Sequence, residues 1–178
     1  MANPIPSGTW TIDPVHSRLG FSVRHMMIAK VRGSFTDFSG EITIADDPLQ
    51  STVAVDVQLE SIDTANDDRD NPLRTNDFFD VANHPTMTFR STRVEADGDD
   101  YIVHGDLTIR GVTNPVALEV EFDGTSKDPW GGTRAGFSAE TEINRKDWGM
   151  EWNTPLEAGG VMLGDKVKIE IDVQLVKS

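Results

Sequence analysis

The feature of this sequence that most restricts its fold is an alternation of apolar and polar residues with a period of two. Such alternation is typical of β-strands with one buried and one solvated face, whereas strands buried on both faces read as continuous apolar runs. The sequence therefore predicts an all-β protein rather than a parallel α/β sheet. The segments that alternate in this way are residues 19–24, 53–60, 101–109, 116–122, 135–143 and 167–175.

Two further segments complete the predicted set of strands. Residues 31–45 are typical of a strand pair or of one bent strand, and residues 86–93 show the same alternation. About eight long antiparallel strands are the number that closes a small barrel with room for one ligand. We therefore expect an eight-stranded antiparallel, lipocalin-like β-barrel. The turn-forming sequences expected between its strands include residues 46–48, 96–99, 113–115 and 128–132.

One segment breaks the alternation and predicts a helix. Residues 64–82 begin as a polar stretch, and Pro72 follows an aspartate and an asparagine, which are common N-caps. We therefore expect a short helix over residues 73–79, so that the barrel has one or two short helices in all. Phe78 and Phe79 would then lie at one end of the barrel.

The length, cysteine content and charge of the chain exclude several classes of protein. The 178 residues predict one domain, residues 1–178, with a core at about 9–176. A chain of this length buries enough surface to fold without disulfides or a structural metal. It has no cysteine, which excludes thiol chemistry and thiolate zinc sites. The net charge of −14 disfavours nucleic acids and anionic lipid surfaces as partners.

The sequence shows neither a targeting signal nor a membrane span. Its first eight residues lack the basic and apolar regions of a secretory signal. No stretch approaches the about 18 apolar residues that a spanning helix needs. We therefore expect a cytoplasmic protein without stable membrane insertion, which would hold any lipid ligand inside its fold.

The apolar residues on the inward faces permit two interpretations. In the first, they fill the barrel as an ordinary hydrophobic core, as in a packed stress or scaffold protein. In the second, they surround a dry, elongated cavity that suits an apolar chain. The alternation itself is compatible with both.

Residues typical of catalysis are sparse in this sequence. The four histidines lack HxxxH or HxH spacing, and GxSxG, P-loop, GxGxxG and HExxH motifs are all absent. We therefore predict no catalytic residue, no metal site and no cofactor. His25 is the one histidine on the inward side of its strand, where it is either a core residue or the general base of an enzyme acting on an amphipathic small molecule.

The loop at residues 144–152 is a basic and aromatic cluster in an acidic sequence. Trp148 is either a lid over the barrel end or part of a mouth that contacts an apolar chain. In the second case, Arg145 or Lys146 would meet a polar or phosphorylated head group. Further candidates for such a contact, each near the end of a predicted strand, are Arg24, Arg32 and Arg110.

Several short motifs follow one another between Trp10 and Val176. They are WTIDPVHS (10–17), FSVRH (21–25), VRGSF (31–35), SIDT (61–64), DFFD (77–80), PTMTFRS (85–91), GDLTIRGVT (105–113), INR (143–145) and GDKVKI (164–169). Together and in this order, they resemble the YceI-like family. The resemblance implies a lipocalin-like barrel whose hydrophobic pore holds a polyisoprenoid chain. It implies a soluble carrier of an isoprenoid or similar long-chain lipid, such as a quinone tail or a polyprenyl phosphate, rather than an enzyme.

The pore that the resemblance implies is assigned to this chain by the inward positions of its strands. The predicted ligand-binding residues are Phe21, Val23, His25, Phe35, Phe38, Ile42, Phe78, Phe79, Met87, Phe89, Leu107, Ile109, Leu118, Val120, Phe137, Ile143, Arg145 and Trp148. A homodimer through strand edges or outer faces is compatible with the sequence, which specifies no surface for it.

Overall fold

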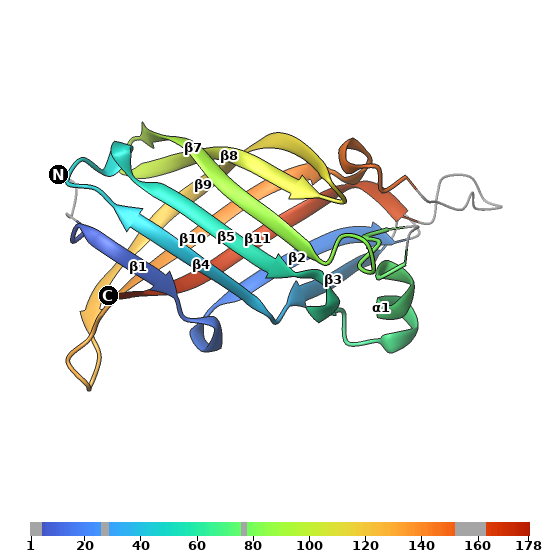
Figure 1. Cartoon of the computed structure of the whole chain (residues 1–178), viewed down its shortest axis with the longest axis horizontal. Helices are drawn as coiled ribbons and strands as arrows, with labels where there is room; N and C mark the ends of the chain where they lie inside the picture. The colour runs from blue at the N-terminus through green and yellow to red at the C-terminus, as the bar shows by residue number, and fades with distance from the viewer. Residues whose placement is uncertain (1–4, 26–28, 76–77, 152–162) are drawn as a thin grey trace.

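The protein forms one closed antiparallel sheet of eleven strands (Figure 1). The structure is a computed structural model that describes residues 5–25, 29–75, 78–151 and 163–178. The sheet closes because β1 pairs with β11 as well as with β4. The strands are β1 (Gly8–Ile12), β2 (Arg18–His25), β3 (Ala29–Phe35), β4 (Phe38–Ile44), β5 (Thr52–Gln58), β6 (Ile62–Asp63), β7 (Thr86–Asp97), β8 (Asp100–Ile109), β9 (Val112–Lys127), β10 (Thr133–Asn144) and β11 (Leu163–Lys177).

The barrel has eight long strands, because three of them are interrupted. The turn η1 (Pro14–His16) separates β1 from β2, a break at residues 36–37 separates β3 from β4, and η3 (Leu59–Ser61) separates β5 from β6. The two parts of an interrupted strand keep the same neighbour; β1 and β2, for example, both pair with β11. The predicted eight-stranded antiparallel barrel is confirmed. Of the two alternatives for residues 31–45, a strand pair or one bent strand, the structure shows the bent strand, because β3 and β4 follow one another and do not pair with each other.

The helix lies earlier in the chain than the sequence predicted. α1 spans Asp67–Leu73 rather than residues 73–79. Three aspartates in its first turn favour this start, because carboxylates stabilise the positive end of a helix. Pro72, which we interpreted as a first-turn residue, lies in the last turn, and Phe78 and Phe79 follow in turn structure.

One predicted turn belongs to a strand instead. Residues 113–115 lie in β9, and the chain reverses at Arg110 and Gly111, whose φ angles are 55° and 73°. Pro115 is accommodated because β9 pairs with β10 only from Glu119 onward, so this part of the strand has one strand neighbour.

The two ends of the barrel are built from different elements (Figure 1). One end, here called the η2 end, carries the C-terminus and the turn η2 (Pro48–Gln50) between β4 and β5. The other, here called the α1 end, carries α1 and the turn η4 (Arg145–Trp148) after β10. Among the described helices, none has the length and apolar character that crossing a membrane requires.

Candidate functional site: an apolar cavity inside the barrel

The barrel interior contains a cavity of about 230 Å³. Inward side chains from β1 to β5 and from β7 to β11 form its wall. Ser51, Tyr101 and Thr141 are the only described lining residues with a polar side chain, and no described lining residue is charged. Such a cavity favours hydrocarbon over water, because water needs several polar partners to replace its bulk hydrogen bonds. The structure therefore supports the cavity interpretation over a fully packed core.

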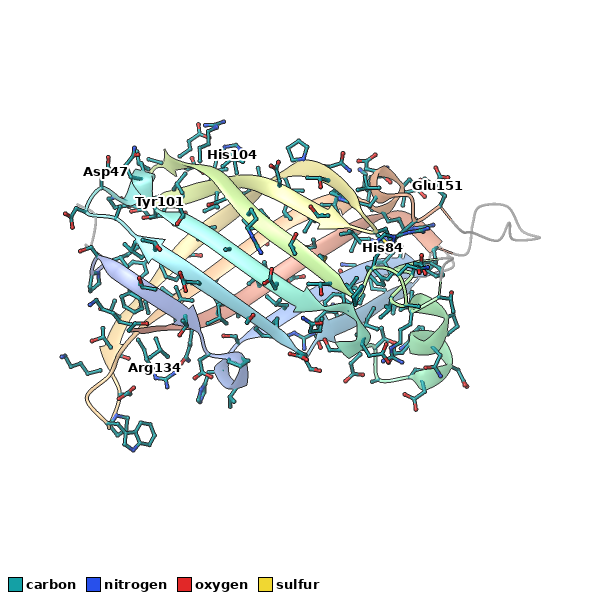
Figure 2. The ribbon with its side chains drawn as sticks, viewed as in Figure 1. Asp47, His84, Tyr101, His104, Arg134 and Glu151 are labelled. Atoms are coloured by element: carbon teal, nitrogen blue, oxygen red, sulfur yellow. The ribbon has the colours of Figure 1, made fainter. Side chains whose placement is uncertain are left out.

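The cavity runs along the barrel and reaches the η2 end. Its lining there includes Pro48 and Ser51 from the η2 turn and Ile5 from the segment before β1. Figure 2 places Tyr101, another lining residue, near this end together with Asp47. In the other direction, the lining ends before the barrel does. The described lining therefore reaches the η2 end and stops short of the α1 end.

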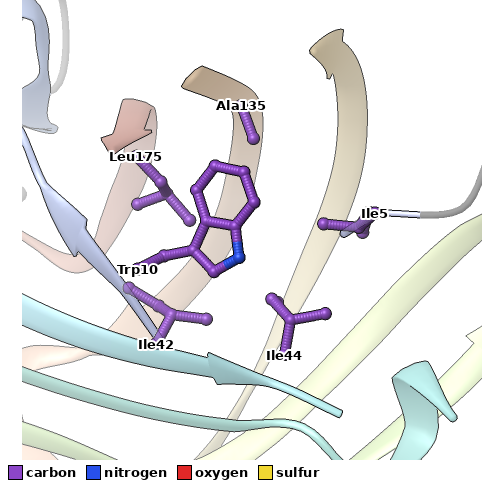
Figure 3. Packing of buried hydrophobic residues seen from close by; sticks show 6 residues of the cluster. All are labelled: Ile5, Trp10, Ile42, Ile44, Ala135 and Leu175. Carbon is purple, nitrogen blue, oxygen red and sulfur yellow. The ribbon is translucent and has the colours of Figure 1, made fainter. Parts of the chain in front are cut away.

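At the η2 end, Trp10 fills one corner of the barrel. Its side chain is fully buried, with 0% exposed, and the indole Nε1 donates a hydrogen bond to the Pro6 carbonyl oxygen at 3.0 Å. Its neighbours come from three strands, β4, β10 and β11, and from the segment before β1. Figure 3 shows them as Ile5, Ile42, Ile44, Ala135 and Leu175.

The α1 end is filled by a group of side chains that we call the plug. Trp148, on η4, is 2% exposed, and its Nε1 donates a hydrogen bond to the Leu107 carbonyl oxygen at 2.9 Å. The plug separates the cavity lining from this end of the molecule. Of the two interpretations of Trp148, a lid over the barrel end and part of a mouth for the ligand, the structure favours the lid. Its members are Phe79, Ile109, Ile143, Trp148 and Met150.

The segment between β6 and β7 is held at the α1 end by a buried carboxylate. Asp70, 3% exposed, accepts hydrogen bonds from the Thr64 backbone nitrogen at 3.0 Å and from the Thr64 hydroxyl. The Arg69 guanidinium donates to the Thr64 carbonyl oxygen at 2.7 Å. Phe79 then packs edge-to-face on Phe35, with ring centroids 5.9 Å apart. These contacts carry Phe79 into the plug.

Arg145 stabilises the loops around the plug and does not line the cavity. Its guanidinium is 3% exposed; Nε donates to the Gly164 carbonyl oxygen at 2.9 Å and Nη1 to the Met150 carbonyl oxygen at 2.6 Å. Burial lowers the pKa of Arg145 below its usual value, and the nearby Asp165 carboxylate opposes this shift. Lys146 Nζ lies 3.4 Å from the same carboxylate. In this geometry, neither cation reaches the cavity.

Comparison with known proteins identifies the family of this barrel. A model of the YceI-like domain matches residues 10–175. The chain belongs to the YceI-like family. It is 40% identical over 167 residues to a UPF0312 protein of Staphylococcus epidermidis, an alignment that covers 93% of this chain and 95% of the relative.

Two solved structures have the same barrel. The YceI protein of Campylobacter jejuni superposes with a TM-score of 0.75 at 29% identity, over 87% of this chain and 90% of that one. A polyisoprenoid binding domain from Saccharophagus degradans superposes with a TM-score of 0.73, over 95% of this chain and 98% of that one. Because its identity is 18%, the second likeness shows the fold alone.

The YceI-like cavity brings together about half of the residues that the sequence singled out. The predicted residues that line it are Phe21, Phe35, Ile42, Met87, Phe89, Leu107, Leu118, Val120 and Phe137. Sequence reasoning missed much of β5 and β11, although both segments show the same alternation. Lining residues from these two strands include Val53, Val55, Val57, Ile169, Ile171, Val173 and Leu175.

The structure places the other predicted residues outside the cavity lining. Phe38, Phe78, Ile109 and Trp148 are buried in packing beyond it, and Phe79 and Ile143 are partly buried there. Val23 is partly buried on β2, one inward position past Phe21. The side chain of His25 lies outside the described residues, so its role as core residue or general base stays a prediction.

The described residues show no arrangement typical of a metal or catalytic centre. No group of three or more His, Cys, Asp or Glu among them could hold a metal ion. His16 and His104 bond to Asp13 and Glu95 at 2.7 and 2.8 Å, and none of these four residues lines the cavity.

Proposed function

We propose that this YceI-like protein is a binding protein that carries a long isoprenoid chain inside its barrel. The cavity carries the proposal: it is apolar, free of charge among its described lining residues and extended along the barrel. Burying about ten methylene groups gains about 8 kcal/mol, which corresponds to a micromolar dissociation constant before the costs of association. The chain itself therefore supplies enough binding free energy without a strong polar anchor.

A structural neighbour supports the same class of ligand. The Saccharophagus degradans domain, which has this fold, is a polyisoprenoid binding domain. The apolar wall here suits such a chain, because branched prenyl units fill a cavity lined by valine, isoleucine, leucine and phenylalanine. A role in storing or delivering the chain follows if the ligand is retained in water and released to an acceptor.

A pair of matched variants tests this proposal. Ala139 lines the cavity on β10, whereas Ala117 is exposed on the outside of β9. Ala139→Phe fills the cavity with a ring, and Ala117→Phe adds the same ring to the surface. Uptake of geranylgeraniol, a prenyl alcohol, is measured as a mass increase of the intact protein by native mass spectrometry.

We expect wild type and Ala117→Phe to take up one equivalent of geranylgeraniol. The affinity of Ala139→Phe should be lower by a factor of about ten or more, because the added ring occupies the space of the prenyl chain. No uptake by the wild type would contradict the proposal. Equal uptake by Ala139→Phe, with the cooperative unfolding transition retained, would contradict it as well.

A further inference from the structure

Three turns of the molecule share an Asp-Pro pair followed by an apolar residue. In each turn, the aspartate Oδ1 accepts a hydrogen bond from the backbone nitrogen two residues later, at 2.9 to 3.0 Å. The proline between them has a restricted backbone, so the apolar side chain is held at the tip of a fixed turn. The three sequences are DPV (13–15) at η1, DPL (47–49) at η2 and DPW (128–130) between β9 and β10.

The tips of these turns supply three of the four exposed large apolar side chains among the described residues. Val15 is 84% exposed and Trp130 is 85% exposed, whereas Leu49 has most of its surface covered. The fourth such residue is Val112, 39% exposed at the start of β9. Val15 and Trp130 therefore project almost fully from the barrel, and an apolar environment that covers them gains their transfer free energy.

One ion-pair network joins the two turns that carry Val15 and Trp130. Arg134 Nη1 donates a hydrogen bond to Asp13 Oδ2 at 2.7 Å, and its Nε donates to Asp128 Oδ2 at 3.4 Å. Figure 1 shows η1 and the β9–β10 turn projecting on the same side of the barrel, below it in this view, and Figure 2 shows Arg134 between them. The two tips therefore belong to one fixed surface, here called the tip face.

The charge of the tip face differs from that of the whole protein, which has 30 acidic and 16 basic residues. The tip face consists of residues 13–18 and 125–133, all of which the structure describes. Its two carboxylates, Asp13 and Asp128, are at most 15% exposed because both bind Arg134. Its exposed charged side chains are Arg18 and Lys127. The tip face is therefore apolar and basic on an otherwise acidic molecule.

Two separate apolar tips suit a lipid bilayer better than a protein partner. A stable protein interface buries about 800 Å² on each side around a continuous apolar core, which two single side chains do not supply. A bilayer accepts single side chains at the depth of its head groups, and tryptophan is enriched there because its ring is apolar and its N–H is polar. The net charge of −14 favours an uncharged, zwitterionic surface over an anionic one.

We propose that the tip face docks reversibly on a zwitterionic phospholipid bilayer, with the side chains of Trp130 and Val15 in the head-group region. Arg18 and Lys127, exposed on the same turns, then meet phosphate oxygens of the lipids. The binding is weak because only two apolar side chains enter. This inference goes beyond the carrier function and does not depend on what the cavity holds.

Sedimentation with phosphatidylcholine vesicles tests the docking in the absence of any other protein. We expect the full-length wild type to sediment with the vesicles at millimolar lipid. Its tryptophan emission should shift to shorter wavelength on binding, because Trp130 leaves water, and Trp130→Ala should abolish this shift. No sedimentation of the wild type would overturn the proposal and leave the tip face to a protein partner. Sedimentation with an unchanged emission would overturn the role of Trp130.

Matched variants locate the contact with the bilayer. Trp130→Ala should lower the vesicle affinity by a factor of about ten or more, and Val15→Ala by about two- to threefold, in keeping with the apolar area that each removes. Val112→Ala makes the same change as Val15→Ala on β9, next to the β8–β9 turn, and should leave the affinity unchanged. Equal losses for the two valine variants, or an unchanged affinity of Trp130→Ala, would overturn the proposal.

Ligand uptake by the same variants separates the docking from the carrier function. We expect Trp130→Ala to take up geranylgeraniol as the wild type does while its vesicle affinity falls, because Trp130 does not line the cavity. A parallel loss of uptake and vesicle binding would overturn a separate docking surface. Vesicle binding by a wild type that takes up no prenyl chain would support the docking and contradict the carrier function alone.

Discussion

Among the residues that the structure describes, each end of the barrel has one buried tryptophan, and the two have different consequences for the cavity. Trp10 and Trp148 are almost equally buried, and each indole nitrogen donates to a backbone carbonyl oxygen. Trp10 packs into one corner of the η2 end, where Pro48 and Ser51 still belong to the cavity lining. Trp148 joins the plug that fills the α1 end.

The difference follows from the elements that carry the two side chains. Trp10 lies on β1, so the register with β4 and β11 fixes its position. Trp148 lies on a short turn outside the sheet, where Arg145 and the hydrogen bond to Leu107 position it. In this barrel the strands form the cavity wall, and the connecting segments determine which end is closed.

The largest expected effect on the free energy of unfolding comes from removing the central side chain of the plug, Trp148. Trp148→Ala should lower the free energy of unfolding by about 3–5 kcal/mol, because it leaves a cavity and an unpaired carbonyl oxygen. Trp130, 85% exposed in the β9–β10 turn, is the matched control, and Trp130→Ala should cost less than about 0.5 kcal/mol. Urea unfolding measures both. A small effect of Trp148→Ala would show that the turn does not close this end.

The second-largest expected loss of stability comes from releasing the segment that carries Phe79 into the plug. Asp70→Ala should cost about 2–3 kcal/mol, because it leaves the buried donors of Thr64 without their acceptor. Asp68→Ala removes an exposed carboxylate from the same helix and should cost less than about 0.5 kcal/mol. Equal losses in urea unfolding would mean that the carboxylate does not hold the segment.

The smallest expected effect on stability comes from the ion pair between Asp13, which precedes η1, and Arg134 on β10. The hydrogen bond from Arg134 Nη1, at 2.7 Å, lowers the pKa of Asp13 from 3.8 to about 2, with a further contribution from His16. Since the folded-state pKa is the lower one, this stabilisation is complete above about pH 4 and is lost as the pH falls through about 2.

Asp13→Asn should therefore lower the free energy of unfolding by about 1 kcal/mol at pH 7, after allowance for solvent screening. The difference from wild type should shrink as the pH approaches 2. Asp46→Asn, at an exposed carboxylate without a cation nearby, should show no such dependence. Denaturant unfolding between pH 7 and pH 2 measures both variants, and a constant difference for Asp13→Asn would rule out the ion pair as its cause.

The alternation of the strands predicts which side chains face inward, but not how far along the barrel they lie. Leu107 and Ile109 share one face of β8, yet Leu107 lines the cavity whereas Ile109 packs in the plug. The depth at which the cavity ends depends on Trp148 and Phe79, which reach it from segments outside the sheet. No periodicity encodes that position.

The polar candidates show a second limit of the sequence. Arg145 has the charge that a phosphate site needs, and the basic and aromatic composition of the loop at residues 144–152 is compatible with such a role. Its donors instead bond to carbonyl oxygens of Met150 and Gly164, which are close only in the folded chain. Tyr101, by contrast, lies on an inward position of the alternating segment 101–109 and lines the cavity, yet it is not among the predicted ligand-binding residues.

Organic extraction of the natively purified protein tests most directly whether the cavity holds an isoprenoid chain. Mass spectrometry of the extract identifies the ligand, and the native mass of the intact protein gives its stoichiometry. We expect one equivalent of an isoprenoid lipid. A clean extract, together with no uptake of added prenyl chains, would contradict it.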